Sequence, residues 1–230
     1  MERKHYIWAV VALFPVLLVL LFATFRPILV LPRIKLAPGF AFTDQRGERL
    51  TNEDLRGKFV LYTFTYTHCE HDCPQDMALI PAIQDRIAQF PVEIPVEFVT
   101  IAFDTVRDTP ERLAAYAAEV EVDPAQWHIV TGEPKQLKQV IGNGFTTYYG
   151  PRGGQDGPKV GEQEDGEFDL DPAFILVDGW GIMRAEYRTA EPDVDLIMRD
   201  IDLIATEARN SKGATRYAYE AAHLFVCYPR

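Results

Sequence analysis

The 230-residue chain is poor in cysteine and in positive charge. Its three cysteines are too few for a disulfide scaffold and do not fit a four-cysteine zinc site. Lys and Arg number 23 against 34 Asp and Glu, and the net charge of −11 argues against a nucleic-acid-binding protein, which needs a basic surface. The sequence shows no internal repeat. At this length there is room for an anchor and one domain, but not for two full domains.

One long run without charge is present, over residues 7–25. Its nineteen residues are close to the roughly 20 that cross a bilayer as a helix. No A-x-A-like cleavage site follows, which favours a retained single-pass membrane anchor over a cleaved signal peptide. Basic residues lie on both sides of the run, so they do not decide its orientation. A close cysteine pair in the large domain favours the extracytoplasmic (periplasmic) side of the cell membrane.

We divide the chain into a short N-terminal tail (1–6), the transmembrane anchor (7–25), a proline-rich extended stalk (26–38), one folded domain (39–209) and a C-terminal tail (210–230). Strand and helix patterns in the domain follow the order βαβαβα and then ββα, which predicts an α/β fold: a mixed sheet with helices on both faces. The expected hairpins are 40–55 and 173–187, and the expected strands are 58–65, 96–103 and 127–131. Two helices are expected to begin at Pro74 and Pro110, and two more are expected over 134–141 and 194–208.

The cysteine pair follows the most apolar of these strands. The run Lys58–Thr65 leads to Cys69, and Pro74 opens a helical pattern. Free N–H groups and the positive end of a helix dipole favour the thiolate form of Cys69. Cys73 comes one helical turn later, so both sulfurs can lie on one face and either close a disulfide or hold one soft metal ion. The third cysteine, Cys227, is isolated near the end of the chain and is interpreted as an inert thiol.

Four stretches closely resemble the SCO (SenC/PrrC) family, and together they span roughly residues 36–208: FTYTHCEHDCP, IAFDTVRDTPERLAAYA, WHIVTG and AFILVD. The resemblance implies a thioredoxin-like mixed sheet flanked by helices and preceded by one N-terminal transmembrane helix. It also implies a role in the electron-transport chain, in assembling the copper centre of a respiratory oxidase. The protein would deliver copper there or reduce cysteines, with copper as its cofactor and a respiratory membrane complex and membrane lipid as its partners.

Residues are carried over from this resemblance by position. Cys69 and Cys73 match the two copper-binding, redox-active cysteines of the family. The family's third ligand is a histidine, and Asp171 stands where that histidine would be. Copper(I) is soft and prefers thiolate and imidazole, whereas a carboxylate is a hard ligand. Asp171 is kept as a metal-site candidate, with weaker selectivity for copper expected.

Four other histidines were considered as a replacement ligand: His68, His71, His128 and His223. Each of them is better interpreted as an ordinary polar residue than as a metal ligand. His68 precedes Cys69 directly and is the best placed of the four to influence the pKa of that thiol.

Pro172 is the third candidate for a catalytic role, beside the two cysteines. Thioredoxin-like reductases, which this chain resembles, carry a cis-proline just before the corresponding hairpin strand, where it faces their cysteine pair. We therefore predict a cis Asp171–Pro172 bond, although cis X–Pro bonds are only about 5–6% of the total. A cis bond here would favour thiol–disulfide exchange over copper binding.

Two further groups of polar residues are weaker candidates. The acidic alternation within 165–171 could bind calcium, but a solvated acidic loop fits it better. Asp104, Arg107 and Asp108 are expected to brace the turn before a helix that Thr109 caps.

Three hypotheses follow for function. The first is an SCO-like copper carrier for a respiratory complex. The second is a membrane-tethered thiol–disulfide oxidoreductase, in which Cys69 attacks and Cys73 resolves. The third is a non-catalytic SCO-like accessory subunit of a membrane electron-transport complex, which would not be an enzyme.

Overall fold

The computed structural model describes residues 2–25, 28–68, 76–89, 92–120, 123, 125–151 and 168–225. The chain forms two compact units. One comprises Arg33–Ala205, and the other comprises Met1–Pro32 together with Thr206–Arg230.

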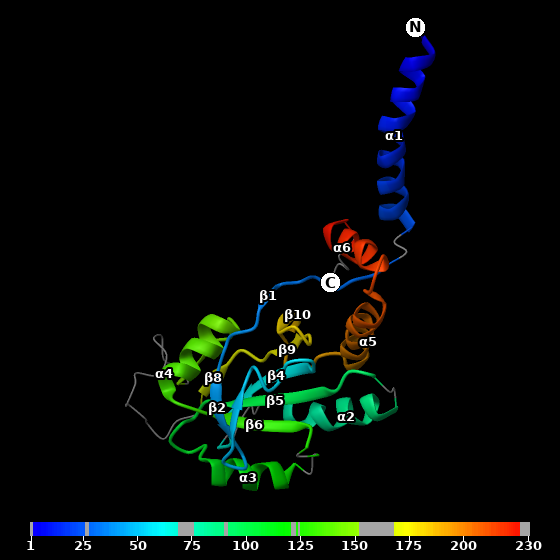
Figure 1. Ribbon diagram of the computed structural model, residues 1–230. Coiled ribbons are helices and arrows are strands. Elements are labelled where there is room, and N and C mark those ends of the chain that lie inside the picture. Colours follow the sequence, from blue (N-terminus) through cyan, green and yellow to red (C-terminus); the bar gives the residue numbers. More distant parts are fainter. Residues whose placement is uncertain are drawn as a thin grey trace. The chain divides into compact units, whose positions relative to one another are not determined.

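The larger unit is built on an eight-stranded mixed sheet with helices on both sides of it (Figure 1). Strands β4, β5 and β6 are parallel to one another, and all other neighbours pair antiparallel. The strand order is β1 (Lys35–Leu36), β10 (Ile182–Tyr187), β9 (Phe174–Val177), β4 (Phe59–Thr65), β5 (Val96–Ala102), β6 (Trp127–Thr131), β2 (Ala41–Asp44) and β3 (Arg49–Thr51). The predicted mixed α/β fold is confirmed.

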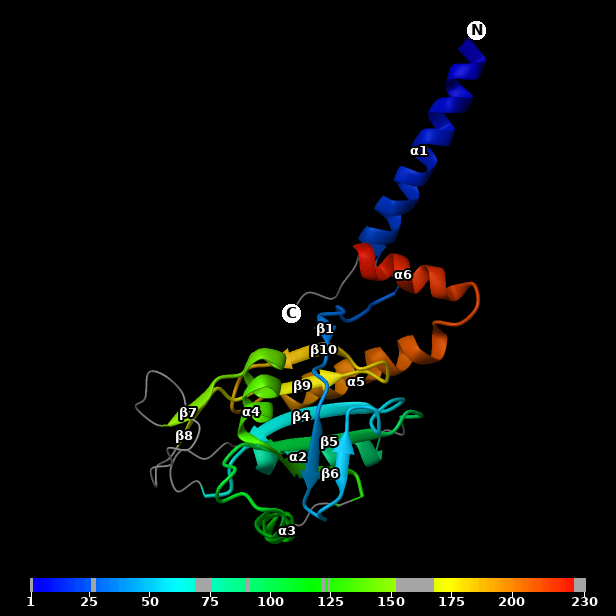
Figure 2. The same ribbon diagram turned by 60° about the vertical axis from the view of Figure 1, so that its left-hand side comes forward.

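The central strands are buried on both faces, as their continuous apolar sequences require. On one face, Val60, Tyr62 and Phe64 of β4 pack in a core that includes Phe145. The rings of Tyr62 and Phe145 lie 4.9 Å apart. The helices of this unit are α2 (Asp76–Gln89), α3 (Pro110–Glu119), α4 (Pro134–Leu137) with the π-helical turn η1 (Lys138–Gly144), and α5 (Val194–Asn210) up to Ala205 (Figure 2).

Both predicted hairpins are present. Strands β2 and β3 pair with Phe42 opposite Leu50, and β10 pairs with β9. Their turns contain Gly47 at φ +78° and Gly181 at φ +79°, a backbone conformation that glycine adopts without steric cost. A second, two-stranded sheet joins β7 (Tyr149–Pro151) to β8 (Phe168–Leu170).

The last part of the predicted extended stalk over 26–38 pairs with the main sheet. Lys35 and Leu36 form the edge strand β1, paired with Met183 and Ile182, and the N–H of Ala37 donates to Gly181 O at 2.8 Å. The segment forms hydrogen bonds with backbone groups of β10, which would otherwise lie unpaired at the edge of the sheet. The folded domain therefore begins before residue 39.

The smaller unit contains helix α1 (Glu2–Phe25) and helix α6 (Thr215–Phe225). Val30, Tyr219 and Ala222 form a small buried cluster in it. Sequence patterns did not predict α6, because 210–230 was interpreted as a tail. A helix is confirmed across the predicted anchor, but among the residues that could be searched none forms a helix with the length and hydropathy of a membrane crossing. The membrane anchor stays a prediction.

Candidate metal and thiol site

Three elements of the candidate site meet at one edge of the main sheet. The carboxyl ends of the parallel strands β4 and β5 share this edge, and the antiparallel β9 begins there. Residues Thr67–His68 follow β4, Asp104–Asp108 follow β5, and Asp171–Pro172 precede β9. We call these three segments the carboxyl edge.

Cys69 and Cys73 lie outside the described residues, as do His71 and Cys227. The chain is described up to His68, three residues past the end of β4, and again from Asp76, where α2 begins. The predicted strand before the pair and the predicted helix after it are confirmed. Ile80 and Ile83 are buried in α2, as its apolar spacing predicted. That the two sulfurs lie on one face, where they could close a disulfide or hold a metal ion, stays a prediction.

Thr67 is bound through all of its polar groups. Its N–H and its hydroxyl both donate to Asp108 Oδ1, at 3.1 and 2.6 Å. Arg112 donates from Nε to the Thr67 hydroxyl oxygen at 3.2 Å and from Nη2 to the Thr67 carbonyl at 3.3 Å. We call Asp108 and Arg112 the Thr67 brace. His68 Nδ1 lies 3.2 Å from the same hydroxyl and 4.0 Å from Asp108 Oδ1.

Asp108 is completely buried. Burial raises the pKa of its carboxyl group, and the two hydrogen bonds from Thr67 only partly offset this effect. Its second oxygen, Oδ2, has no hydrogen-bond partner in the part of the chain that the structure describes. A buried acceptor without a partner is uncommon in folded proteins.

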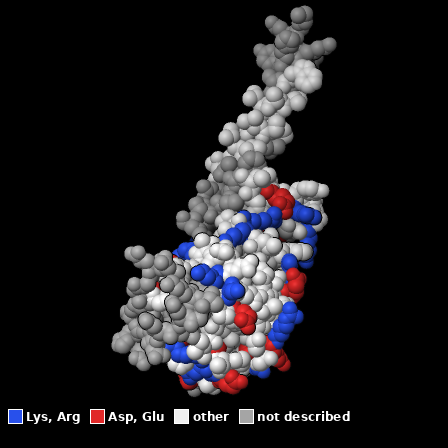
Figure 3. All heavy atoms as spheres, turned by 90° about the vertical axis from the view of Figure 1, so that its left-hand side faces the viewer, with Lys and Arg blue, Asp and Glu red and all other residues white. Residues whose placement is uncertain are grey.

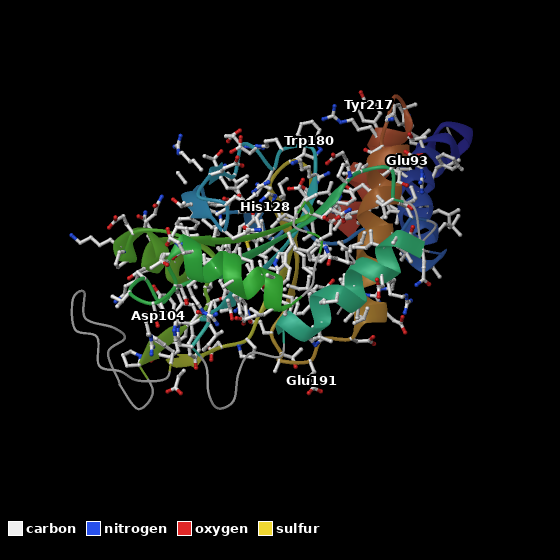
Figure 4. All side chains as sticks on the ribbon, turned by 90° about the horizontal axis from the view of Figure 1, so that it is seen from below. Glu93, Asp104, His128, Trp180, Glu191 and Tyr217 are labelled. Carbon is white, nitrogen blue, oxygen red and sulfur yellow. The ribbon has the colours of Figure 1, made fainter. Side chains whose placement is uncertain are left out.

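The turn between β5 and α3 agrees with the prediction. Arg107 pairs with Asp104 through Nε and Oδ2, and the Asp108 N–H donates to Asp104 O at 2.8 Å. Thr109 caps α3, since its hydroxyl accepts from the N–H of Arg112. Asp104 lies far from His128 in Figure 4.

The predicted cis Asp171–Pro172 bond is wrong, because the described chain contains no cis peptide bond. The N–H of Asp171 donates to Tyr148 O at 3.0 Å, which extends the pairing of β7 with β8. This pairing keeps the chain extended up to Pro172, and an extended residue before a trans proline is the favoured conformation. Asp171 is exposed and Pro172 is half-buried.

Aromatic side chains bring β8 to the carboxyl edge. Tyr66, directly before Thr67, lies 5.2 Å from Phe168 between ring centroids and 5.6 Å from Phe103. The strand that leads to Asp171 thus packs beside the strand that leads to the cysteines, as the resemblance implied.

The remaining histidines are engaged elsewhere. His128 is buried with its Nε2 3.2 Å from Glu97 Oε2, near the amino ends of β5 and β6. His223 lies 2.8 Å from Glu207 within the smaller unit. Within the described ranges, no three His, Cys, Asp or Glu side chains are grouped so as to hold a metal ion.

Comparison with known proteins shows the family of this chain. The sequence model of SCO1/SenC matches residues 31–205. The chain belongs to the SCO1/SenC family. The mitochondrial SCO1 homolog of Homo sapiens is 29% identical over 137 residues, which are 60% of this chain and 42% of the human protein. The chain spans about half the length of the curated SCO relatives it matches.

Solved SCO structures share the fold. A SCO1/SenC family lipoprotein from Bacillus anthracis has a TM-score of 0.64 and 24% identity, covering 74% of this chain and 95% of that one. ScoI of Arabidopsis thaliana with copper bound has a TM-score of 0.60 and 25% identity, covering 76% of this chain and 98% of that one. SCO proteins are linked to copper binding and to assembly of cytochrome c oxidase.

Sequence reasoning missed the Thr67 brace. One signal was available: Arg112 is a cation in the first turn of a helix, where the dipole disfavours positive charge unless a partner compensates. The position of that partner, Thr67, could not be read from local patterns.

Proposed function

We propose that this SCO1/SenC chain binds copper(I) through Cys69 and Cys73 and takes part in assembling the copper centre of a respiratory oxidase. The observation that carries the proposal is the family match over residues 31–205 with both cysteines retained in the chain. Two thiolates are the donors that copper(I) prefers. Copper is the cargo in this role, and the described carboxyl edge is the part of the fold that leads into the cysteines.

The donor set around the cysteines is partly suited to copper. Asp171, at the family's histidine position, offers only hard oxygen ligands. His68 is the histidine that the structure describes at this edge, and its Nδ1 faces the Thr67 hydroxyl. We therefore expect the two thiolates to supply most of the binding energy and Asp171 to add little selectivity.

Thiol–disulfide exchange is the second candidate, favoured by the loss of a soft third ligand at position 171. The Cys69 thiolate would attack a partner's disulfide and form a mixed disulfide. Cys73 would then attack Cys69, releasing the partner's two thiols and leaving a Cys69–Cys73 disulfide. The trans Asp171–Pro172 bond removes the feature that most favoured this role, and any role of Pro172 stays a prediction.

Anaerobic titration of the reduced full chain with Cu(I) tests the proposal. We expect one copper per chain, lost in Cys69→Ser and in Cys73→Ser and retained in the control Cys227→Ser. Absence of copper uptake, with a measurable reduction potential for the pair, would favour the oxidoreductase. Neither activity, together with co-purification in a membrane complex, would favour the accessory subunit.

Restoring a soft ligand tests the metal role of Asp171. Asp171→His should bind Cu(I) more tightly than the wild-type chain, because imidazole replaces a hard carboxylate. Asp169→His, two residues earlier on the exposed strand β8, is the matched control. Equal affinities for both variants would remove position 171 from the site.

We also propose that residues 7–25 anchor the chain, with the larger unit on the extracytoplasmic side. Support comes from the uncharged run and from the exposed apolar side chains of α1, such as Trp8 and Leu13. Carbonate washing of membranes tests the anchor: the full chain should stay in the pellet. A chain lacking residues 2–25 should be released, and release of the full chain would contradict the anchor.

A further inference from the structure

The Thr67 brace holds a point of the backbone that comes two residues before Cys69. The N–H, hydroxyl and carbonyl of Thr67 are all bound by Asp108 and Arg112, at 2.6–3.3 Å. Backbone groups that leave a strand usually find water or a turn partner. In this chain the backbone groups of Thr67 are bound instead by two charged side chains, one just before α3 and one in its first turn.

The brace is itself fixed in place. Asp108 is tied to Asp104 by its N–H, and the next residue, Thr109, caps α3. Arg112 is held at its far end by Glu119, with 2.9 Å between Nη1 and Oε1. Helix α3 therefore gives the brace a rigid base.

The brace is also costly for the fold, which argues that stability alone does not explain it. Asp108 is a fully buried carboxylate whose Oδ2 has no partner among the described residues. Arg112 lies at the helix end where the dipole disfavours a cation. A neutral acceptor at position 108 could satisfy the Thr67 N–H without burying a charge. Departures from local rules of this kind concentrate at functional sites.

We propose that Asp108 and Arg112 are positioning residues of the cysteine site: by holding Thr67 they fix the backbone from which Cys69 continues. This inference rests on the proposed function and deepens it. Groups that orient a metal ligand or a reactive thiol matter nearly as much as the ligand, because both disulfide closure and metal binding need narrow geometry.

Two substitutions test the brace. Thr67→Val removes the hydroxyl bonded by both partners, and Asp108→Ala removes the oxygen that accepts from the N–H and the hydroxyl of Thr67. Thr63→Val is the matched control, because it is the same change at a buried threonine of β4 that bonds Thr100 at 2.8 Å and lies away from the carboxyl edge. We expect Cu(I) affinity to fall about tenfold or more in Thr67→Val and in Asp108→Ala. Thr63→Val should bind like the wild type, and Thr67→Ser, which keeps the hydroxyl, should retain most of the affinity.

A second readout does not depend on copper. In a Cys73→Ser, Cys227→Ser background, the rate of Cys69 alkylation by iodoacetamide is measured against pH. Thr67→Val and Asp108→Ala should shift this profile, and Thr63→Val should leave it in place. A protein that binds no copper but shows the shift would contradict the proposed function and support the brace. Unchanged affinity and an unchanged profile in both brace variants, in a chain that binds copper, would overturn the brace alone.

Discussion

Two groups of charged residues, each built around buried carboxyl groups, lie toward opposite ends of the parallel strands, and they differ in how these charges are compensated. The amino-end cluster comprises Asp44, Arg46, Lys58, Glu97 and His128. Arg46 bonds Asp44 at 2.7 Å, and Lys58 lies 2.6 Å from Glu97. Each buried carboxylate of this cluster has a cation beside it.

The pKa values of the carboxylates reflect this difference. Burial alone would raise the pKa of Asp44, but Arg46 and the N–H groups of Arg46 and Glu48 outweigh it, and the pKa is lowered. The pKa of Glu97 is lowered in the same way, where His128 and Lys58 outweigh burial. For Asp108 burial prevails and the pKa is raised, because its bonding partners are the neutral N–H and hydroxyl of Thr67.

The two groups of charged residues therefore have different roles: one stabilises the fold, and the other positions residues of the candidate site. At the amino-end cluster, each carboxylate stabilises the folded chain in its ionised form. At the carboxyl edge, Asp108 opposes folding when ionised, yet it anchors the segment that leads to the cysteines. Proteins commonly accept such a cost at functional sites. On the surface, acidic and basic side chains are intermingled over the face shown in Figure 3.

The largest expected effect comes from the amino-end cluster. Asp44→Asn keeps the shape of the side chain but removes its charge. The Arg46 guanidinium then faces either an amide NH2 group or a neutral amide oxygen in place of the carboxylate oxygen. Because Arg46 is half exposed, we expect a loss of about 1.5 kcal/mol in the free energy of unfolding, at the lower end for a charged hydrogen bond. Urea denaturation at neutral pH measures it. A loss below about 0.5 kcal/mol, the ordinary size for a surface change, would remove the contrast between the two clusters.

A smaller effect is expected in the acid limb of the stability curve. The pKa of Glu97 is lowered in the folded chain, so its contribution is present above the unfolded value of about 4.5 and is lost as pH falls through the folded pKa. Glu97→Gln should remove about 1 kcal/mol at neutral pH and flatten the acid limb. The measurement is the urea midpoint as a function of pH, with the exposed Glu93→Gln change as control. Parallel curves for wild type and Glu97→Gln would contradict the assignment.

Local patterns in the sequence predicted what is local in the structure. The buried run of β4, the two hairpins and the Thr109 cap follow from propensity and spacing, and all are confirmed. Strand β1 was missed because two residues have no pattern of their own, and it exists only through pairing with β10.

The details of the site needed tertiary information. Asp108 and Arg112 are 41 and 45 residues from Thr67 along the chain, so no periodicity reports their contacts. The cis-proline prediction came from analogy with reductases, and the pairing of Asp171 with Tyr148 overrides it. Family resemblance predicted which strand ends converge, but not which side chains brace them.

The smallest effect on stability, and the opposite in sign, is expected from Asp108→Asn, the same chemical change that is costly at Asp44. Above its raised folded pKa, ionised Asp108 costs the fold free energy, and this cost is relieved as pH falls through that pKa. The amide can still accept from Thr67 without a buried charge, so we expect unfolding free energy equal to wild type or up to about 1 kcal/mol higher at neutral pH. The gain should shrink in acid, where the wild-type carboxyl becomes neutral. Urea denaturation at neutral and at acid pH measures the difference in unfolding free energy and its decrease in acid. A loss as large as that of Asp44→Asn would show that Asp108 holds the fold, and the two clusters would then be alike.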